Sequence, residues 1–471
     1  MKRFFNMLCV LFVHFQSNGQ ILEDFSFQNP DIQNADTLTL QQVFAVINAN
    51  HPKLQVSELG VQSAKASVLS AWGRLDPAIN GEITSKNETD KFKQQTAMAE
   101  LSIPIFWGQK ISASWKRNIG LFDQDNSTSL NGESTIGISF PLWRNILIDK
   151  NRAAILKAEQ LPTIADAAII ENRNELFLKS SEKYWEWSGA LMKYSIAKNL
   201  LRLAEIRLSG IIEEHKKGER AKIDSIEMTQ ELLRRKGLLI KSRRDYEKAA
   251  IAVGQYIWNK DGTPALFPSD IVPTAMNDPL LISKLTYAND KEKALKTRPE
   301  ISQIRGEISM ADIETQLTNE LWKPDINVKF APFNTQSFQN GSQQIDYKIG
   351  VQAEMPLLLR NANGVKQQAE VKQQSLQLKE SLLLRTISAE IDDATSELIA
   401  SYQQYIAAKQ ENNAAIQMEN AERQLLIQGE SSLFTVNLRE RFSAESAGRV
   451  VDALIQYHKA FSMYQWSIAG F

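Results

Sequence analysis

The side chains that could support catalysis or bind a metal are few in this chain of 471 residues, and they lie far apart. Beyond the N-terminal apolar run, the histidines are His51, His215 and His458, and no thiol follows Cys9. No two of these histidines have the i, i+4 spacing of a helical zinc site, and no Gly-rich phosphate loop is present. There are two adjacent acidic pairs, Glu213-Glu214 and Asp392-Asp393. Both lie in stretches with a helical pattern and are expected to face solvent. The chain is therefore not expected to be an enzyme or to need a cofactor or metal.

The charge balance gives no bulk attraction to nucleic acid. The sequence has 54 Lys and Arg residues against 55 Asp and Glu residues, a formal net charge of −1. Long-range attraction to a polyanion needs an excess of positive charge. No nucleic-acid partner is expected.

Residues 1–20 have the order of a secretory signal peptide. Lys2 and Arg3 precede a short apolar run, and a polar segment follows it. The run is too short to cross a bilayer as a helix. We expect cleavage close to residue 20 and export from the cytoplasm. Because Cys9 lies inside the run, we interpret it as part of the signal rather than as a lipid anchor.

Two stretches of the chain, residues 38–260 and 281–471, carry the same order of signals. Each opens with a helical pattern that stops before a proline, Pro52 in the first and Pro299 in the second, which can begin a new helix as its first residue. A further proline follows 25 residues later in both stretches. We therefore predict two internal structural repeats, joined by a connector rich in Pro and Asp at 258–280.

Alternating apolar and polar residues follow these further prolines and are typical of strands. We predict strands at about 77–140 in the first repeat and at about 324–356 in the second. The last strand of each set reaches a proline, Pro141 or Pro356, placed where its missing N–H costs least. These two prolines are predicted to mark strand-to-helix junctions.

Each set of strands precedes a long stretch with almost no Gly or Pro. These stretches predict helical hairpins at 145–257 and 362–468. The break-free run between Gly364 and Gly429 would form a rod of roughly 95 Å if continuous. Its apolar residues repeat at heptad spacing, which favours packing between long helices. A rod of this length is not needed by a compact domain.

Each predicted hairpin turns at a Gly-Glu pair. The first pair is Gly218-Glu219 and the second is Gly429-Glu430. A glycine just past a helix end adopts the left-handed conformation that closes the helix. We predict that these pairs form the tips of the two hairpins.

The order of helices, strands, junction proline and helical hairpin occurs twice after a signal-like segment. This order is similar to that of the TolC family of outer-membrane efflux proteins. The resemblance covers about residues 38–470. Its most specific parts are Leu38-Thr39-Leu40 through Asn50-His51-Pro52, the strand ends Phe140-Pro141-Leu142 and Met355-Pro356-Leu357, and the two Gly-Glu tips. The resemblance implies a mainly α fold with a membrane β-barrel. A long antiparallel α-helical barrel would continue into a β-barrel closed across the protomers of a homotrimer.

The resemblance also implies a location and a function. The chain would lie in the outer membrane of a Gram-negative bacterium, with its helices extending into the periplasm. It would be the passive exit duct of a tripartite efflux pump or a type I secretion system. The implied partners are a periplasmic adaptor protein, an inner-membrane pump or ABC transporter, and outer-membrane lipid.

The alternative is a soluble periplasmic coiled-coil adaptor or structural protein without a membrane barrel. Predicted strands of roughly nine to eleven residues, which span a bilayer, favour the channel.

In this family, acidic residues after the tip glycine help to constrict the periplasmic entrance. The matching positions of the first tip are Asp224 and Glu227, whereas the second tip has no acid at the corresponding places. Arg439 and Arg441 could pair with these acids across a closed entrance. A plainer interpretation of Asp224 is a charge that interacts with the dipole of the helix N-terminus.

The first repeat is longer than the second between its strand prolines, by about 32 residues. The extra residues alternate around Pro104-Ile105-Phe106-Trp107-Gly108 and predict an added hairpin. If the hairpin joins the barrel, each chain supplies six strands; if not, it lies at the rim and each chain supplies the four strands usual in the family. We favour four.

Three tryptophans are candidates for a membrane-interface belt, since the sequence pattern places each of them near a strand end: Trp107, Trp115 and Trp143. The alternative is simple packing.

Overall fold

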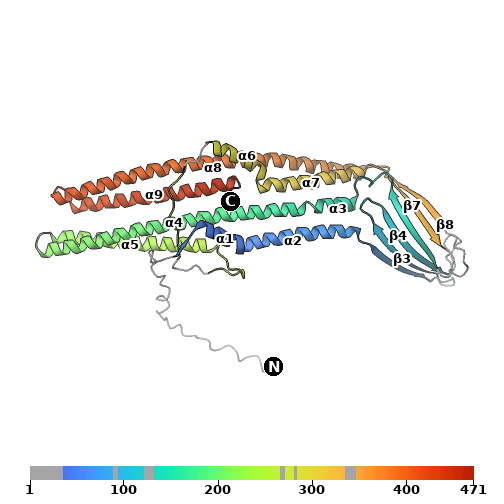
Figure 1. Ribbon diagram of the computed structural model, residues 1–471, viewed down its shortest axis with the longest axis horizontal. Helices are drawn as coiled ribbons and strands as arrows, with labels where there is room; N and C mark the ends of the chain where they lie inside the picture. Colours follow the sequence, from blue (N-terminus) through green and yellow to red (C-terminus); the bar gives the residue numbers. More distant parts are fainter. Residues whose placement is uncertain (1–35, 88–93, 121–131, 266–270, 281–283, 335–345) are drawn as a thin grey trace, which may run out of the picture.

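The computed structural model describes residues 36–87, 94–120, 132–265, 271–280, 284–334 and 346–471. The signal peptide expected at residues 1–20 lies outside this part of the chain. The molecule is elongated, with a β-sheet at one end and the turns of two helical hairpins at the other (Figure 1). The chain is mainly helical, as expected from the sequence.

The rod consists mainly of four long helices. α4 (Leu161–Lys216) and α5 (Lys222–Gly254) form one hairpin, and α8 (Arg360–Gln428) and α9 (Leu433–Ser467) form the other. α4 packs against α9, so the two hairpins lie side by side. The 69 residues of α8 correspond to a length of about 104 Å.

Two pairs of shorter helices precede the sheet. They are α1 (Leu40–Asn50) with α2 (Pro52–Trp72), and α6 (Lys284–Thr297) with α7 (Pro299–Glu320). Proline is the first residue of both α2 and α7, as predicted, because the missing N–H has no helical acceptor at that position. α2 packs along α4, and α7 packs along α4 and α8, so the rod continues to the sheet.

The long helix of the first half is interrupted, whereas α8 is continuous. α3 (Lys150–Ala158) ends at Glu159, and α4 begins at Leu161. Pro162 lies in the first turn of α4, where a helix tolerates a residue without an N–H. The proline therefore starts a second helix rather than allowing α3 to continue.

The described strands of the main sheet form one antiparallel sheet in the order β2-β3-β4-β5-β7-β8. Their bounds are Ala78–Lys86, Gln94–Pro104, Lys110–Ile119, Glu133–Pro141, Asp325–Asn334 and Asp346–Glu354. The four strands that we favoured for each chain are therefore too few. The added hairpin, β3 and β4, pairs along its whole length and lies inside the sheet rather than at its rim.

A small parallel pair of strands lies halfway along the rod. β1 (Asp36–Leu38) pairs with β6 (Ile271–Pro273) of the segment between the two halves. The Tyr184 hydroxyl of α4 donates to the Leu38 carbonyl at 2.8 Å and accepts from the Thr274 N–H at 3.1 Å. This segment thus ties the N-terminal residues to the middle of α4, next to the fully buried Trp187.

Candidate functional site

One face of the six-stranded sheet is apolar. Residues paired across neighbouring strands point to the same side, so the register identifies the face. Its larger apolar members are Ile79, Ile83, Leu101, Ile103, Ile111, Trp115, Ile119, Ile136, Ile138, Phe140, Ile326, Val328, Phe330, Tyr347, Ile349 and Val351. Arg117, near the end of β4 away from the rod, is a charged residue on the same side. Several of the apolar side chains are widely exposed, among them Ile79 at 81% and Val351 at 68%. The sheet thus presents apolar side chains outward instead of covering them with a core.

The opposite face is polar. It carries Asn80, Glu82, Thr84, Glu100, Ser112, Ser114, Lys116, Lys329, Lys348 and Gln352. Lys110 pairs with Glu100 at 3.3 Å, and Lys329 donates to Gln352 at 3.4 Å. Because acidic and basic groups are mixed, this face suits contact with water without a dominant charge.

The junction between sheet and rod is held by a buried arginine that the sequence analysis did not identify. The Arg152 side chain is only 6% exposed. Its guanidinium donates to the carbonyls of Asn145, Ile146 and Leu147, and to the Asp149 carboxylate at 2.6 Å. Four acceptors on one short segment fix the path by which the chain leaves β5 and enters α3.

Both predicted junction prolines lie where the strands end. Pro141 is the last residue of β5, and Pro356 follows β8, which ends at Glu354. Asn145 then adopts a left-handed φ of 66°, a conformation that asparagine tolerates better than most residues. Its N–H donates to the buried Glu320 carboxylate at the end of α7, at 3.1 Å. The exit of β5 is therefore bound to the helix that leads into β7.

The turn between β3 and β4 packs against the end of the rod that adjoins the sheet. Phe106 stacks on Trp72 of α2 with ring centroids 5.7 Å apart. Gly108 has φ +84°, and a Cβ there would meet the Asn145 carbonyl oxygen at 3.2 Å and Pro141 at 3.3 Å. The added hairpin is thereby fixed at its base between α2 and the junction.

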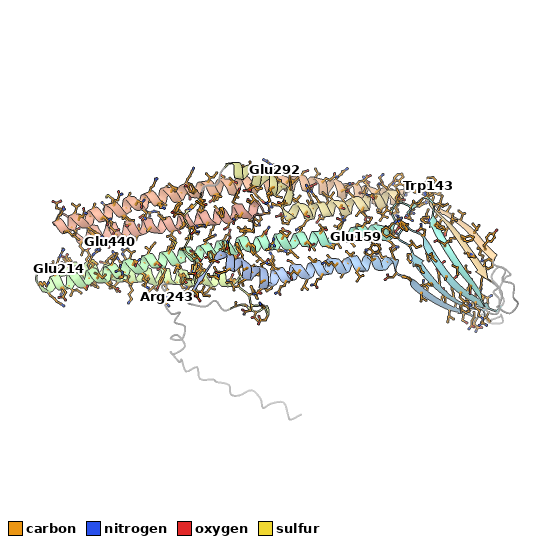
Figure 2. All side chains as sticks on the ribbon, in the orientation of Figure 1. Trp143, Glu159, Glu214, Arg243, Glu292 and Glu440 are labelled. Atoms are coloured by element: carbon orange, nitrogen blue, oxygen red, sulfur yellow. The ribbon has the colours of Figure 1, made fainter. Side chains whose placement is uncertain are left out.

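Two of the three candidate tryptophans lie at this end of the sheet. Trp107, in the β3–β4 turn, is 68% exposed. Trp143, just after β5, is 55% exposed (Figure 2). The position predicted for Trp115 is wrong, because it is the sixth of the ten residues of β4. The strand extends to Ile119, four residues beyond Trp115.

At the other end of the molecule, both tip glycines close their helices as predicted. Gly218 and Gly429 each have φ +81°. The Glu219 N–H donates to the Glu214 carbonyl at 3.0 Å, and the Glu430 N–H donates to the Leu425 carbonyl at 2.9 Å. Both tips therefore have the same hydrogen-bonded ending, in which a left-handed residue satisfies carbonyls that the helix leaves open.

The predicted gate residues lie next to the tips but do not meet within one chain. Asp224 is in the first turn of α5, where its charge complements the helix dipole, and both it and Glu227 are half-buried. No ion pair joins either acid to Arg439 or Arg441 among the residues that the structure describes. Arg439 instead approaches Glu422 of α8 at 3.5 Å. Any pairing of these arginines with the acids would have to involve another copy.

A buried carboxylate joins all four long helices near the tips. Glu440 of α9 is 1% exposed and accepts hydrogen bonds from Arg207 of α4, Arg235 of α5 and Arg423 of α8 (Figure 2). The contacts of Arg235 and Arg423 are 2.8 Å long. Burial opposes ionisation, but the arginine hydrogen bonds hold the pKa of the Glu440 carboxyl below its usual value.

A second acid completes this charge cluster. Glu231 accepts from the side chains of Arg234 and Arg235, the latter at 2.8 Å, and they keep its pKa low although burial favours the protonated form. The side-chain Oδ1 of Asn437 accepts from Arg207 at 2.8 Å. Each charge in the cluster thus has a partner, which a buried ion needs.

The sequence contained a signal for this cluster that we did not use. Leu433, Val436, Glu440 and Ser443 stand at the three- and four-residue spacing of a buried helix face, and all four are buried. A carboxylate at such a position needs partners from the neighbouring helices.

Two features are absent from the described part of the chain. No helix there combines the length and the apolar character needed to cross a membrane. No group of three or more His, Cys, Asp or Glu side chains is arranged there to hold a metal ion.

Comparison with known proteins gives structural relatives but no sequence relatives. No family model matches the chain, and no curated protein matches it in sequence. Among solved structures, the open state of the MtrE outer membrane channel of Neisseria gonorrhoeae matches with a TM-score of 0.67 and 12% identity, over 92% of this chain and 89% of that one. The CmeC outer membrane channel of Campylobacter jejuni matches with a TM-score of 0.61 and 13% identity, over 92% and 86%.

A third structure agrees with these two. The outer membrane protein VceC of Vibrio cholerae matches with a TM-score of 0.64 and 12% identity, over 92% of this chain and 96% of that one. The matches span nearly the whole of each chain. They establish that this chain has the fold of outer-membrane channels, as the resemblance to the TolC family implied.

Proposed function

We propose that three copies of this chain form a channel through the outer membrane, continued across the periplasm by the helical rods. The channel is the passive exit duct of a tripartite efflux pump or a type I secretion system. The observation that carries this proposal is the sheet with an apolar face and a polar face, set at one end of a rod of about 104 Å. The shared fold with outer-membrane channels supports it.

The two faces of the sheet suit a barrel wall in lipid. A soluble monomer rarely exposes a contiguous apolar patch larger than a few hundred Å². Hydrocarbon stabilises such a face, while the polar face suits a water-filled lumen. The sheet edges have to be paired in lipid, where no water can bind their N–H and C=O groups. Further copies of the chain would supply that pairing.

The chain's internal organisation fits two structural repeats, residues 38–260 and 281–471, joined by the connector at 258–280. In both, a helix that starts with proline leads into strands, and the strands lead into a hairpin closed by a left-handed glycine. In a trimer, six such hairpins would build the wall of the periplasmic tunnel.

The partners proposed are a periplasmic adaptor protein and an inner-membrane pump or ABC transporter, which supplies the energy. Co-purification of the tagged chain from intact membranes would identify them. An inner-membrane transporter recovered with the chain would support the duct, and recovery of the chain alone from cross-linked cells would count against it.

Asp224 and Glu227 are proposed to narrow the periplasmic entrance. The double variant Asp224→Ala, Glu227→Ala should raise single-channel conductance in planar lipid bilayers severalfold, because six carboxylates would leave the ring of tips. Glu213→Ala, an exposed acid on α4 before the tip, is the matched control and should leave the conductance unchanged. An unchanged conductance in the double variant would remove the gate assignment.

The channel itself is tested with the unaltered protein. It should fractionate with outer membranes, migrate as a trimer that dissociates on heating, and give discrete conductance steps in planar bilayers. Recovery in the soluble periplasmic fraction, with no conductance, would instead favour an adaptor or structural protein.

A further inference from the structure

The six-stranded sheet is open at both edges. β2 pairs with β3 only and β8 with β7 only, among the strands that the structure describes. Both edge strands have nine residues, and each pairs without a break along its inner side. Free edges in stable monomers are blunted by short strands, charged side chains, prolines or bulges, or are covered by another element. Neither β2 nor β8 contains a proline, and neither has a bulge in its paired register.

The directions of the two edges are complementary. β2 begins at the rod and runs away from it, whereas β8 returns to the rod and ends at Glu354 (Figure 1). If two copies stand side by side with their rods aligned, β2 of one copy lies antiparallel to β8 of the next. All other neighbours in the sheet are also antiparallel, so the new pair continues the same pattern.

We propose that β2 of each copy pairs with β8 of the next copy, so that three copies close a barrel of eighteen strands. This inference rests on the proposed channel. It adds the number of strands and the residue pairing between β2 of one copy and β8 of the next, which we call the seam. The partner is a second copy of this chain because the two edges match in length, direction and face pattern. The barrel is incomplete without the partner's strand.

The face pattern restricts the register of this seam. A shift by one residue in the pairing moves every side chain to the other side of the sheet. Ile79 and Ile83 must therefore stand opposite Ile349, Val351 or Ala353, which share the apolar face. With the rods aligned, Ala78 of β2 and Glu354 of β8 lie at the same level, next to the rod. Glu82 therefore stands opposite Lys348, Gly350 or Gln352 of the next copy, on the polar face.

Eighteen strands make a wider lumen than twelve. With strands about 4.8 Å apart and tilted by about 40°, the backbone diameter is about 36 Å for eighteen strands and about 24 Å for twelve. Barrels of sixteen to eighteen strands leave an aqueous channel. The mixed charges of the polar face add little ion selectivity.

The rod does not widen in the same proportion. The β3–β4 turn is seated directly on α2 and adds no helix. The helices that adjoin the sheet in each chain are α2, α3, α7 and α8. A trimer would then join twelve helices to eighteen strands. The membrane part of the duct therefore admits bulky solutes, and the helical part determines the size limit.

Engineered cysteines test the seam directly. The only native cysteine is Cys9, so the background variant is Cys9→Ser. Glu82→Cys is combined in turn with Lys348→Cys, Gly350→Cys and Gln352→Cys, and outer membranes are treated with a mild oxidant. At least one combination should give a covalent band with the mass of three chains on a non-reducing gel.

The matched controls lie one residue away. Glu82→Cys with Ile349→Cys or Val351→Cys places the thiols on opposite faces, and less than a tenth of the cross-linking is expected. Should Glu82→Cys fail to assemble, Thr84→Cys on the same face replaces it. Cross-linking of the opposite-face pairs, or of no pair, overturns the inference.

Conductance separates the two possible failures. If the cross-links are absent but the protein still forms channels in planar bilayers, the eighteen-stranded closure is wrong and the proposed function stands. If no channels form, the proposed function itself fails.

Discussion

Glu440 carries a negative charge at a place where four helices leave almost no room for water. A buried ion pair contributes little to stability relative to apolar packing, but removal of one partner leaves the other charge uncompensated. Arg207 would be the residue most affected, because Arg235 still pairs with Glu231 and Arg423 with Glu419. The cluster thus holds the relative positions of the two hairpins near the tips, where a small displacement would change the width of the entrance.

Glu440→Gln should destabilise the tip half of the rod. The expected loss is about 3–5 kcal/mol, the range for a broken buried ion pair. Arg207 loses its carboxylate partner, whereas Arg235 and Arg423 each lose one of two. Limited proteolysis of the detergent-solubilised protein and thermal unfolding followed by circular dichroism would measure it. Glu411→Gln removes a carboxylate that pairs with Arg449 at the surface, where both side chains are at least half-exposed, and should change neither measurement.

The same cluster predicts a dependence on pH. The pKa values of Glu440 and Glu231 are lowered in the fold, despite burial, by their arginine partners. Their contribution is therefore complete above the carboxyl pKa of the unfolded chain, about 4.3, and is lost as the pH falls through the lowered values. The unfolding temperature should drop more steeply below pH 4.3 in the unaltered protein than in Glu440→Gln. Parallel curves would contradict this prediction.

The turns and close approaches of the elements depend on glycines at particular places. Gly218 and Gly429 supply the left-handed residue that ends each long helix at its tip. At Gly189, by contrast, a Cβ would collide with Ile455, so this glycine allows α4 and α9 to approach each other. Two physical reasons for glycine, conformation and space, therefore occur in the same rod.

Gly429→Ala separates these reasons, because a Cβ there would meet no atom within 4 Å. A left-handed alanine costs about 1–2 kcal/mol, so the tip should open more often and be cleaved faster by a protease. Gly210→Ala is the control, since its Cβ also meets nothing within 4 Å but the residue lies in a regular helix. It should be neutral or stabilise by about 1 kcal/mol. Equal cleavage rates in both variants would refute the role of the left-handed turn.

The molecule as a whole combines a sheet that exposes apolar side chains with a rod that buries them. In the middle of the rod, Trp187 and Tyr184 lie in a closed core. In the sheet, most of the large apolar residues lie on one side, where several are widely exposed. Lipid around the sheet and water around the rod would stabilise both arrangements in one chain.

Substitutions at two neighbouring residues of β8 test whether the apolar face of the sheet meets lipid and the polar face meets water. Val351→Lys puts a charge on the apolar face and should cost about 2–4 kcal/mol near the bilayer midplane, so that little protein assembles in the outer membrane. Gln352→Lys places the same side chain on the polar face and should assemble normally. The quantity measured is the heat-dissociable trimer in the outer-membrane fraction. Equal amounts of trimer from both variants would show that the apolar face does not meet lipid.

The sequence alone determined the features that depend on neighbours along the chain. The prolines at the start of α2 and α7, the left-handed glycines at the tips, the alternation of the strands and the length of α8 all follow from local geometry, and they led to the channel fold. Only the tertiary structure decided that β3 and β4 lie inside the sheet, that Arg152 fixes the junction, and that Glu440 joins four helices. These features join residues far apart in the chain, and in the sheet the local pattern of β3 and β4 is the same whether the hairpin is inserted or lies at the rim.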